Sequence, residues 1–432
     1  MLYKKFQANI KELMGENSGF TDSAVAVSGG ADSIALLSLM SRYAKEKRFK
    51  LIIMTVDHNL RVESKMECQY VQNFSKSLGH NCRIFSWDHQ NNFSNIQARA
   101  REGRYNLMTE ACNQLSIFNL ATAHHLDDEI ENFCIKQARK RGTLGLSSSN
   151  INFYNNIRVI RPLYNIPKQE LIDYLIANNI KWFEDESNSS SKYQRNRIRL
   201  FLSQNENFKK EIISKQLVIN ELAEQIKHKL IAAIAHSVSI NEFGFAKINL
   251  VRFLELSNEI RLQLINFVLT IISGNKKIPR FRSASIILAT IEEESQFIKT
   301  LNGCIIKKIE DTLLIYREFG KNLPSNVVLR DNIIWDNRFR FLGEVVKNEI
   351  GAYITYLSIS DYIKIKDSLD LRKLSSLSIN NHKAILFTLP VIKILEKVIS
   401  IPHISYYNEA RLADKYKFSF WPSFVSRFTH FC

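Results

Sequence analysis

The densest group of reactive residue types is SGGADS, which runs from Ser28 to Ser33 between two apolar segments. The adjacent Gly29 and Gly30 can take positive φ angles and let the backbone approach an anion closely. Backbone N–H groups and the two serine hydroxyls would line a concavity at a helix N-terminus, where the helix dipole favours phosphate. The stretch matches neither GxxxxGK[ST] nor GxGxxG. It predicts a pyrophosphate-binding loop, with a plain strand-to-helix turn as the alternative.

The loop also contains a carboxylate, Asp32. A negative side chain cannot attract phosphate directly. Asp32 is therefore better explained as a ligand of Mg²⁺ or as a helix cap.

A second group, AREGRY, places Arg101, Arg104 and Tyr105 at positions i, i+3 and i+4 of an expected helix. These side chains share one helix face. Two guanidiniums beside an aromatic ring suit a phosphate and a stacked base. A solvated basic helix face is the alternative.

A third group, HHLDDEIEN, carries two imidazoles, His124 and His125, followed by Asp127 and Asp128. The carboxylates could cap a helix. They could equally hold magnesium or accept a proton from an attacking amine. No complete set of soft ligands for zinc accompanies them.

These groups lie at the ends of expected strands in an alternating pattern. Strands are expected at 22–27, 50–59, 81–87 and 118–125, and helices at 32–46, up to Leu78, 94–115 and 126–137. Such alternation predicts an α/β domain with a parallel, Rossmann-like sheet. Ligands of these sheets bind at the carboxyl ends of the strands, where the loop Ser28–Gly30, Asp57 with His58, and His124 with His125 all fall.

The rest of the chain predicts two further domains. A strand at 157–164 and a helix at 167–180 complete the first domain, residues 1–205. Residues 206–318 read as a mostly helical middle domain, and short alternating strands from about 305 onward lead into a small mixed α/β domain at 325–432.

Composition narrows the class of protein. Lys and Arg number 59 against 43 Asp and Glu, so the formal charge is +16, which is typical of proteins that bind a polyanion such as nucleic acid. A lysine-rich genome bias is the alternative. No apolar run suits a membrane span or a secretion signal, and the six cysteines form no CxxC pair, which favours a reducing cytoplasm.

Taken in order, the motifs resemble those of the tRNA(Ile)-lysidine synthetases, a family of PP-loop ATP pyrophosphatases. The resemblance covers roughly residues 20 to 200 and rests on SGGADS, VDHNLR, AREGRY, HHLDDEIEN, RGTLGL, RPL, EDESN and RNRIR. It implies that ATP, with Mg²⁺, adenylates the C2 oxygen of a wobble cytidine in tRNA(Ile). The amine of free lysine then displaces AMP, so that the tRNA reads AUA.

The resemblance also implies roles for individual residues. ATP binding would fall to Ser28, Gly29, Gly30, Ala31, Asp32, Ser33, Asp57 and His125, with Asp32 as the metal ligand. Catalysis would fall to Asp32, Arg101, Arg104, Asp127 and Asp128. Lysine or tRNA would be bound by Tyr105, Glu131, Glu184, Arg195, Arg197 and Arg199, of which the two glutamates would attract the amino acid and the three arginines would grip tRNA phosphate.

Partners and alternatives follow from the same resemblance. The expected partners are tRNA(Ile) with a CAU anticodon and free lysine, with no membrane, and a homodimer is compatible with the sequence. The motif HHLDDEIEN departs from the family's DDQxET at Glu129 and Asn132, which bears on fine positioning. Alternatives are a PP-loop cytidine thiolase, an amidotransferase acting on a small molecule, or an inactive RNA-binding relative.

Overall fold

The computed structural model describes residues 1–15, 21–57, 63–87, 96–139, 141–155, 157–184, 194–275, 277–320, 323–343, 351–375, 382–413 and 415–422. The chain forms two compact units, Met1–Glu224 and Gln225–Cys432. The division into three domains at 205 and at 318–325 stays a prediction. His58 and most of the EDESN motif, residues 185–188, lie outside the described residues.

The first unit is built on one sheet with the strand order β3-β2-β1-β4-β6-β5. Its strands are β1 (Ser23–Ala26), β2 (Leu51–Asp57), β3 (Asn81–Ser86), β4 (Asn119–Ala121), β5 (Ile151–Tyr154) and β6 (Ile157–Ile160). All neighbouring pairs are parallel except β5 with β6. The expected α/β class with a parallel sheet is thus confirmed.

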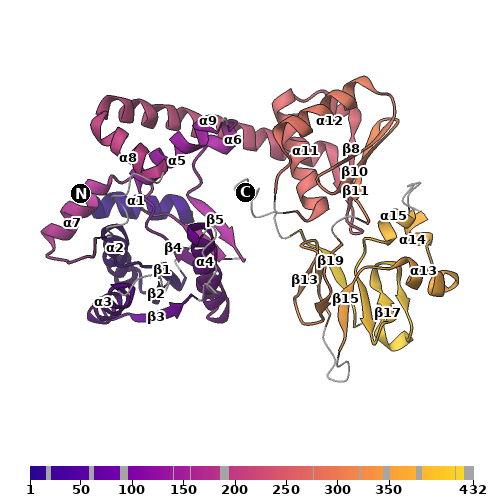
Figure 1. The fold of residues 1–432 in the computed structure, drawn as a ribbon, viewed down its shortest axis with the longest axis horizontal. Coiled ribbons are helices and arrows are strands. Elements are labelled where there is room, and N and C mark those ends of the chain that lie inside the picture. The colour runs from indigo at the N-terminus through magenta and orange to yellow at the C-terminus, as the bar shows by residue number, and fades with distance from the viewer. Residues whose placement is uncertain are drawn as a thin grey trace. The chain divides into compact units, whose positions relative to one another are not determined.

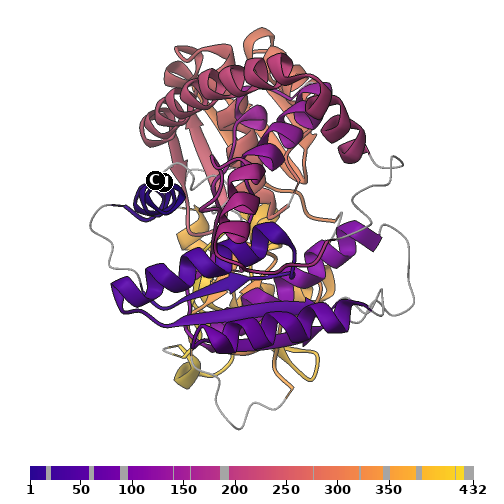
Figure 2. The ribbon, with the colours of Figure 1, turned by 90° about the vertical axis from the view of Figure 1, so that its left-hand side faces the viewer.

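Helices cover both faces of this sheet (Figures 1 and 2). One face is covered by α1 (Leu2–Met14), α2 (Ala31–Lys47), α3 (Glu63–Ser77) and α7 (Lys168–Ala177), and the other by α4 (Ile96–Gln114). The helices α5 (Leu126–Ala138), α6 (Thr143–Leu146), α8 (Gln194–Gln204) and the long α9 (Glu206–Ser237) pack with one another in a separate apolar cluster. Val25 and Ile53 pack into a core with α1, α2 and α7, whereas Ala24 and Ile52 pack against α4. Neighbouring strand residues point to opposite faces, so the unbroken apolar runs serve two cores at once.

The second unit contains antiparallel sheets. One has the order β7-β8-β11-β10-β9, the next β12-β15-β16-β17-β18, and the last β13-β14-β19. The strands are β7 (Val238–Ile240), β8 (Phe245–Asn249), β9 (Phe297–Leu301), β10 (Cys304–Ile309), β11 (Thr312–Arg317), β12 (Val327–Val328), β13 (Ile334–Trp335), β14 (Phe339–Phe341), β15 (Tyr353–Thr355), β16 (Val391–Ile394), β17 (Lys397–Ile401), β18 (Tyr406–Tyr407) and β19 (Phe418–Phe420). The helices are α10 (Leu250–Leu254), α11 (Asn258–Ser273), α12 (Phe281–Glu293), α13 (Ile359–Ile365), α14 (Arg372–Ser375) and α15 (His382–Leu386).

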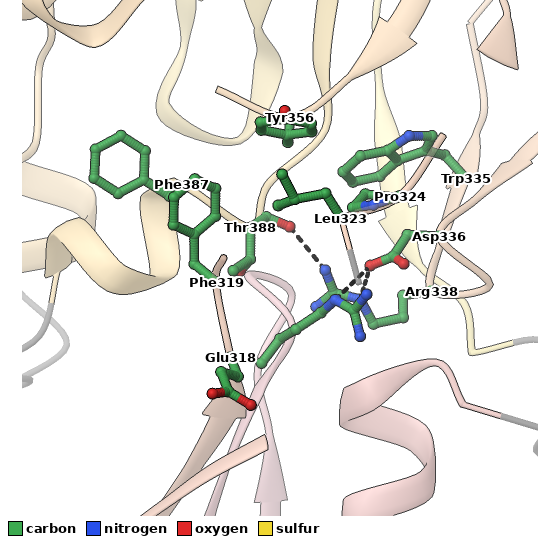
Figure 3. A pocket seen from close by; sticks show the side chains of 11 residues that line it. Glu318, Phe319, Leu323, Pro324, Trp335, Asp336, Arg338, Tyr356, Phe387 and Thr388 are labelled. Carbon is green, nitrogen blue, oxygen red and sulfur yellow. Dashed lines mark hydrogen bonds and ion pairs between the residues drawn. The ribbon is translucent and has the colours of Figure 1, made fainter. Parts of the chain in front are cut away.

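A buried group of ions joins parts of the second unit. Asp336 accepts from Arg338 Nε at 2.7 Å and from Arg317 Nε at 3.0 Å, and Arg338 also donates to the carbonyl of Thr388 at 2.8 Å. Figure 3 shows Arg338 reaching Asp336 and Thr388 beneath the aromatic wall of a small pocket. The group connects the end of β11, the β13–β14 hairpin and the turn after α15.

The structure departs from the expected elements in several places. Strand β4 ends at Ala121 rather than 125, and β6 ends at Ile160 rather than 164, while β5 was not expected at all. Strands β7, β8 and β9 lie within residues that read as mostly helical. The β7–β8 hairpin turns at Gly244, whose φ of +74° favours glycine. Glycine at this position is the sequence signal for the hairpin, but the helical periodicity of the surrounding residues conceals it.

Candidate active site

The SGGADS loop connects β1 to α2 as expected. Gly29 has a φ of +91°, and Gly30 is the N-cap of α2. The hydroxyl of Ser33 donates to the carbonyl of Gly30 at 2.9 Å and accepts the N–H of Ser28 at 3.1 Å. The loop is therefore closed by its own side chain before any ligand binds. Ala31 and Asp32 lie in the first turn of α2, where a helix leaves its N–H groups without internal partners.

Asp32 extends from this turn toward a buried histidine that follows β4. Its Oδ2 lies 3.4 Å from Nε2 of His125, whose side chain is only 2% exposed. Its Oδ1 is buried and has no hydrogen-bond partner among the described residues. Burial acts to raise the pKa of Asp32, but His125 outweighs it and the net pKa is lowered. Asp32 is thus a charged carboxylate with a spare acceptor atom.

His125 lies among three carboxylates, and these set its charge. Besides Asp32, the Oδ2 atoms of Asp127 and Asp128 lie 3.6 Å and 3.5 Å from its ring nitrogens. Burial alone would lower the pKa of His125, but the close carboxylates of Asp127, Asp32 and Asp128 outweigh burial and raise it to about 10. At neutral pH the ring is a cation that holds the carboxylates together.

The two aspartates of the DD pair have different partners. Asp127 accepts the backbone N–H of Lys168, the first residue of α7, at 2.8 Å, and pairs with Nζ of Lys209 on α9 at 2.7 Å. Burial raises its pKa, yet the contacts to His125, Lys209 and Lys168 outweigh burial and lower the pKa. Asp128 instead accepts the N–H of His125 at 3.3 Å and pairs with Arg195 at 2.7 Å.

The RNRIR motif folds onto α5 through two of its three arginines. Glu131, 1% exposed, accepts from Nε of Arg195 at 2.5 Å and from Nε of Arg199 at 2.7 Å. Ile198 and Leu202 on the same helix pack with Ile130 and Phe133 of α5. Arg195 and Arg199 thus face carboxylates inside the unit, and Arg197 is exposed.

The AREGRY residues lie on α4, but the tyrosine ring is not available to a ligand. Tyr105 is buried and stacks on Tyr154 with ring centroids 4.6 Å apart. The guanidiniums of Arg101 and Arg104 lie 5.3 Å and 5.8 Å from its centroid. Burial, with the nearby charge of Arg101, lowers the pKa of Arg104. Tyr105 positions the two arginines rather than presenting a stacking surface.

A positive region surrounds His124. Burial, together with the charges of Arg161, Arg101 and Arg104, holds the pKa of His124 well below its ordinary value, so the ring is neutral. Arg161, from the RPL motif, donates to Glu129 at 2.6 Å, while its buried Nε has no hydrogen-bond partner among the described residues. This concentration of guanidinium charge at the carboxyl edge of the sheet suits an anion.

The remaining expected residues lie at the edges of the site. Asp57 ends β2, is buried, and accepts a hydrogen bond from Ser64. Glu184 is exposed beside Phe183, which pairs with Gly30 and donates to the carbonyl of Gly29 at 3.0 Å. Sequence reasoning assigned no role to Lys168, Lys209 or Arg161. Only Arg161 falls in a quoted motif, so the two lysines could not have been found without the fold.

The described residues contain no group of three or more His, Cys, Asp or Glu side chains arranged to hold a metal ion. Asp32 still fits Mg²⁺, because this ion is commonly bound through one or two carboxylates together with substrate phosphates and water. Its unpartnered Oδ1 is the atom that could serve. No helix among these residues combines the length and hydropathy that a bilayer crossing requires.

Comparison with known proteins assigns the family. The PP-loop domain family matches residues 2–206. The tRNA(Ile)-lysidine synthases of Rickettsia felis and Rickettsia akari are each 55% identical to this chain, and that of Rickettsia prowazekii is 53% identical, with 100% of both chains covered in every case. A solved U34-tRNA thiolase from Methanococcus maripaludis is 17% identical, with a TM-score of 0.42 over 51% of this chain and 79% of its own, which is too distant to bear on function. From its ordered motifs, its sheet and these full-length relatives, the chain belongs to the tRNA(Ile)-lysidine synthase family.

Proposed function

We propose that this chain ligates lysine to C2 of the wobble cytidine of tRNA(Ile), with ATP converted to AMP and pyrophosphate. The observation that carries the proposal is the meeting of Asp32, His125, Asp127 and Asp128 beside the N-terminus of α2. In this arrangement a helix terminus suited to phosphate lies next to carboxylates that can bind an amine. The product tRNA would read AUA.

The first half-reaction needs charge neutralisation on the departing pyrophosphate. The first-turn amides of α2, at Ala31 and Asp32, supply oriented dipoles for phosphate. Magnesium, held through Oδ1 of Asp32, would neutralise phosphate oxygens when bound. His125 fixes the orientation of Asp32 and keeps it ionised. Arg101 and Arg104 face the same edge and are proposed for the α-phosphate or the cytidine.

The second half-reaction needs lysine to lose a proton, since the reference pKa of its amine is about 10.4. The lowered pKa of Asp127 makes it a poor proton acceptor, and its oxygens already receive Lys168 and Lys209. We therefore assign Asp127 to positioning and Asp128 to the incoming amine. Glu131, one helical turn away, is buried and already receives Arg195 and Arg199, so we propose that it positions these arginines. Exposed Glu184 is proposed to draw the cationic amino acid from solvent.

Other features of the proposal concern partners and location. The formal charge of +16 favours tRNA, whose phosphates dominate such affinity, and exposed Arg197 is proposed to grip one. Cytoplasmic action follows from the substrates ATP and tRNA and agrees with the free thiols Cys68, Cys82, Cys112, Cys134 and Cys304. A homodimer stays a prediction that sedimentation can test.

The proposal is tested by incorporation of labelled lysine into a tRNA(Ile) transcript with a CAU anticodon. We expect lysine incorporated into the tRNA, released AMP and released pyrophosphate to be equal in amount. We expect them only when ATP and magnesium are present. A transcript with uridine at the wobble position is the matched control. Release of ADP and orthophosphate, or lysine bound equally to the control, would contradict the proposal.

A further inference from the structure

The turn between α8 and α9 carries two exposed aromatic rings that the chemistry above does not use. Phe201 is 50% exposed and Phe208 is 37% exposed. Their centroids lie 5.3 Å apart at an interplanar angle of 80°. Large apolar side chains exposed together, unlike scattered single ones, mark a binding surface.

The two rings are held rigidly by the turn. Asn205 is the only residue between α8 and α9, and its side chain donates to the carbonyl of Phe201 at 2.8 Å. Its carbonyl accepts the N–H of Lys209 at 3.0 Å, and its N–H donates to Leu202 at 3.3 Å. A ligand would therefore meet a preformed surface, which lowers the entropic cost of binding.

The two helices that carry the rings, α8 and α9, both contact the candidate active site. On α8 the opposite face carries Arg195 and Arg199, which pair with Glu131. On α9 the residue after Phe208 is Lys209, whose ammonium pairs with Asp127. Phe208 is therefore adjacent in the chain to the residue that pairs with Asp127, and Phe201 lies on the helix whose arginines pair with Glu131.

Charge indicates what binds there. Arg197 precedes Phe201 by four residues, so the two share a helix face, and Lys210 follows Phe208 by two; both cations are exposed. Two exposed carboxylates lie nearby, Glu206 and Glu211, and Glu211 already pairs with Lys215 at 2.5 Å. Aromatic rings beside cations suit single-stranded RNA, whose unstacked bases lie on rings while phosphates meet the cations. A purely apolar protein partner would gain nothing from the cations.

We propose that Phe201 and Phe208 form a stacking platform for a base that neighbours the target cytidine in the anticodon loop, with Arg197 on its phosphate. This inference rests on the proposed function, because it assumes an RNA substrate. A loop base stacked on the platform would stay out of the loop's own stack. The target cytidine would then be free to enter the site.

The test separates the aromatic character of the two side chains from their size. We expect Phe201→Ala with Phe208→Ala to weaken binding of an anticodon stem-loop roughly 5- to 150-fold, the range for loss of base–aromatic stacking. Phe201→Trp should keep the affinity, whereas Phe201→Leu should not. Leu222→Ala, at another exposed position of α9 (45% exposed), is the matched control and should bind as the wild type does. Unchanged ATP binding shows that each variant is folded.

Two further measurements separate stacking from other causes. A stem-loop with an abasic nucleotide beside the target cytidine should bind the wild type and the double alanine variant equally. The slope of log Kd against log salt should stay unchanged in the double variant but fall by about one in Arg197→Gln. Wild-type affinity of Phe201→Leu, or loss of self-association instead of RNA binding, would overturn the platform. Failure of the wild type to form lysidine would instead count against the proposed function.

Discussion

At the scale of single residues, the site depends on one buried cation among carboxylates. His125 lies between Asp32, Asp127 and Asp128, so its charge decides how those groups are oriented. Asp32 alone of these carboxylates also starts the helix expected to bind phosphate. Its role can therefore be separated from those of its neighbours.

Asp32→Asn should reduce pyrophosphate release by roughly 100-fold or more, the loss typical when one preorganised charge-stabilising group is removed. The amide keeps the size of the side chain but loses the charge that Mg²⁺ and His125 require. Burst measurements of AMP with tRNA present would record the effect. Asp173→Asn, at an exposed position on α7, is the control, and equal activity in both variants would refute the metal role.

The charge of His125 should appear in the pH dependence of stability. A pKa raised to about 10 means that the folded state holds a proton which the unfolded state releases near pH 6.5. The resulting stabilisation is complete below about pH 6.5 and disappears as pH rises through about 10. The gap in Tm between the wild type and His125→Gln should therefore shrink from pH 6.5 to pH 10. A constant gap would mean that the ring is neutral throughout.

At the scale of elements, helices α7, α8 and α9 all contact the carboxylates of α5. Asp127 receives the first N–H of α7 and the ammonium of Lys209 from α9, and Glu131 receives two arginines from α8. An apolar seam that includes Phe133, Leu202 and Ile212 holds α5, α8 and α9 together. The carboxylates thus also determine how these helices meet.

Lys209→Gln should slow lysidine formation roughly 10-fold, because a partly buried Asp127 loses its cation and its helix contact. The affinity for ATP should change less than about twofold, since the ammonium of Lys209 pairs with Asp127 on α5 and not with the SGGADS loop. Lys210→Gln removes the same charge from the next, exposed residue and should leave kcat unchanged. Equal effects of the two substitutions on kcat would show that only the general charge of α9 matters.

The buried ions of the second unit can be tested for stability. In Asp336→Asn, the guanidiniums of Arg317 and Arg338 lose their shared carboxylate inside the protein. Breaking a buried pair in this way costs about 3 to 5 kcal/mol. We expect the unfolding transition of the second unit to fall to lower urea concentration, while ATP binding by the first unit persists. Asp311→Asn, at an exposed position of the same unit, should not shift it.

The sequence predicted the structure best where residue types at a turn and the order of strands and helices indicated the same fold. Glycine at 29 and 30 and the alternation of strands with helices predicted the first unit and the edge at which its motifs meet. The side chains that contact these motif residues could not be predicted from the sequence. Lys209 lies outside every motif, and its contact to Asp127 exists only because α9 packs on α5. Likewise, nothing in AREGRY distinguishes a base-stacking ring from Tyr105, which Tyr154 covers in the folded chain.

At the scale of the whole molecule, the boundary between the units falls within α9. Phe243, Phe245, Leu314 and Tyr316 share one core with residues that follow 325, such as Ile354 and Ile392. A cut near residue 325 would therefore expose apolar surface inside the second unit. A cut after Glu224 follows the boundary between the two compact units.

The fragment 1–224 should accordingly keep the affinity for ATP within about twofold, because the sheet, the SGGADS loop and the partners of Asp32 all lie within it. Its affinity for tRNA(Ile) should fall at least about tenfold, and the slope of log Kd against log salt should become less steep, since phosphate contacts made by Lys and Arg of the second unit are lost. Isothermal titration with ATP and filter binding with tRNA at several salt concentrations would measure both.

The full chain with Asp336→Asn, assayed below its unfolding transition, controls for damage to the second unit without its removal. Retention of full tRNA affinity and an unchanged slope in the fragment would mean that the first unit alone holds the tRNA, and the second unit would then need another role.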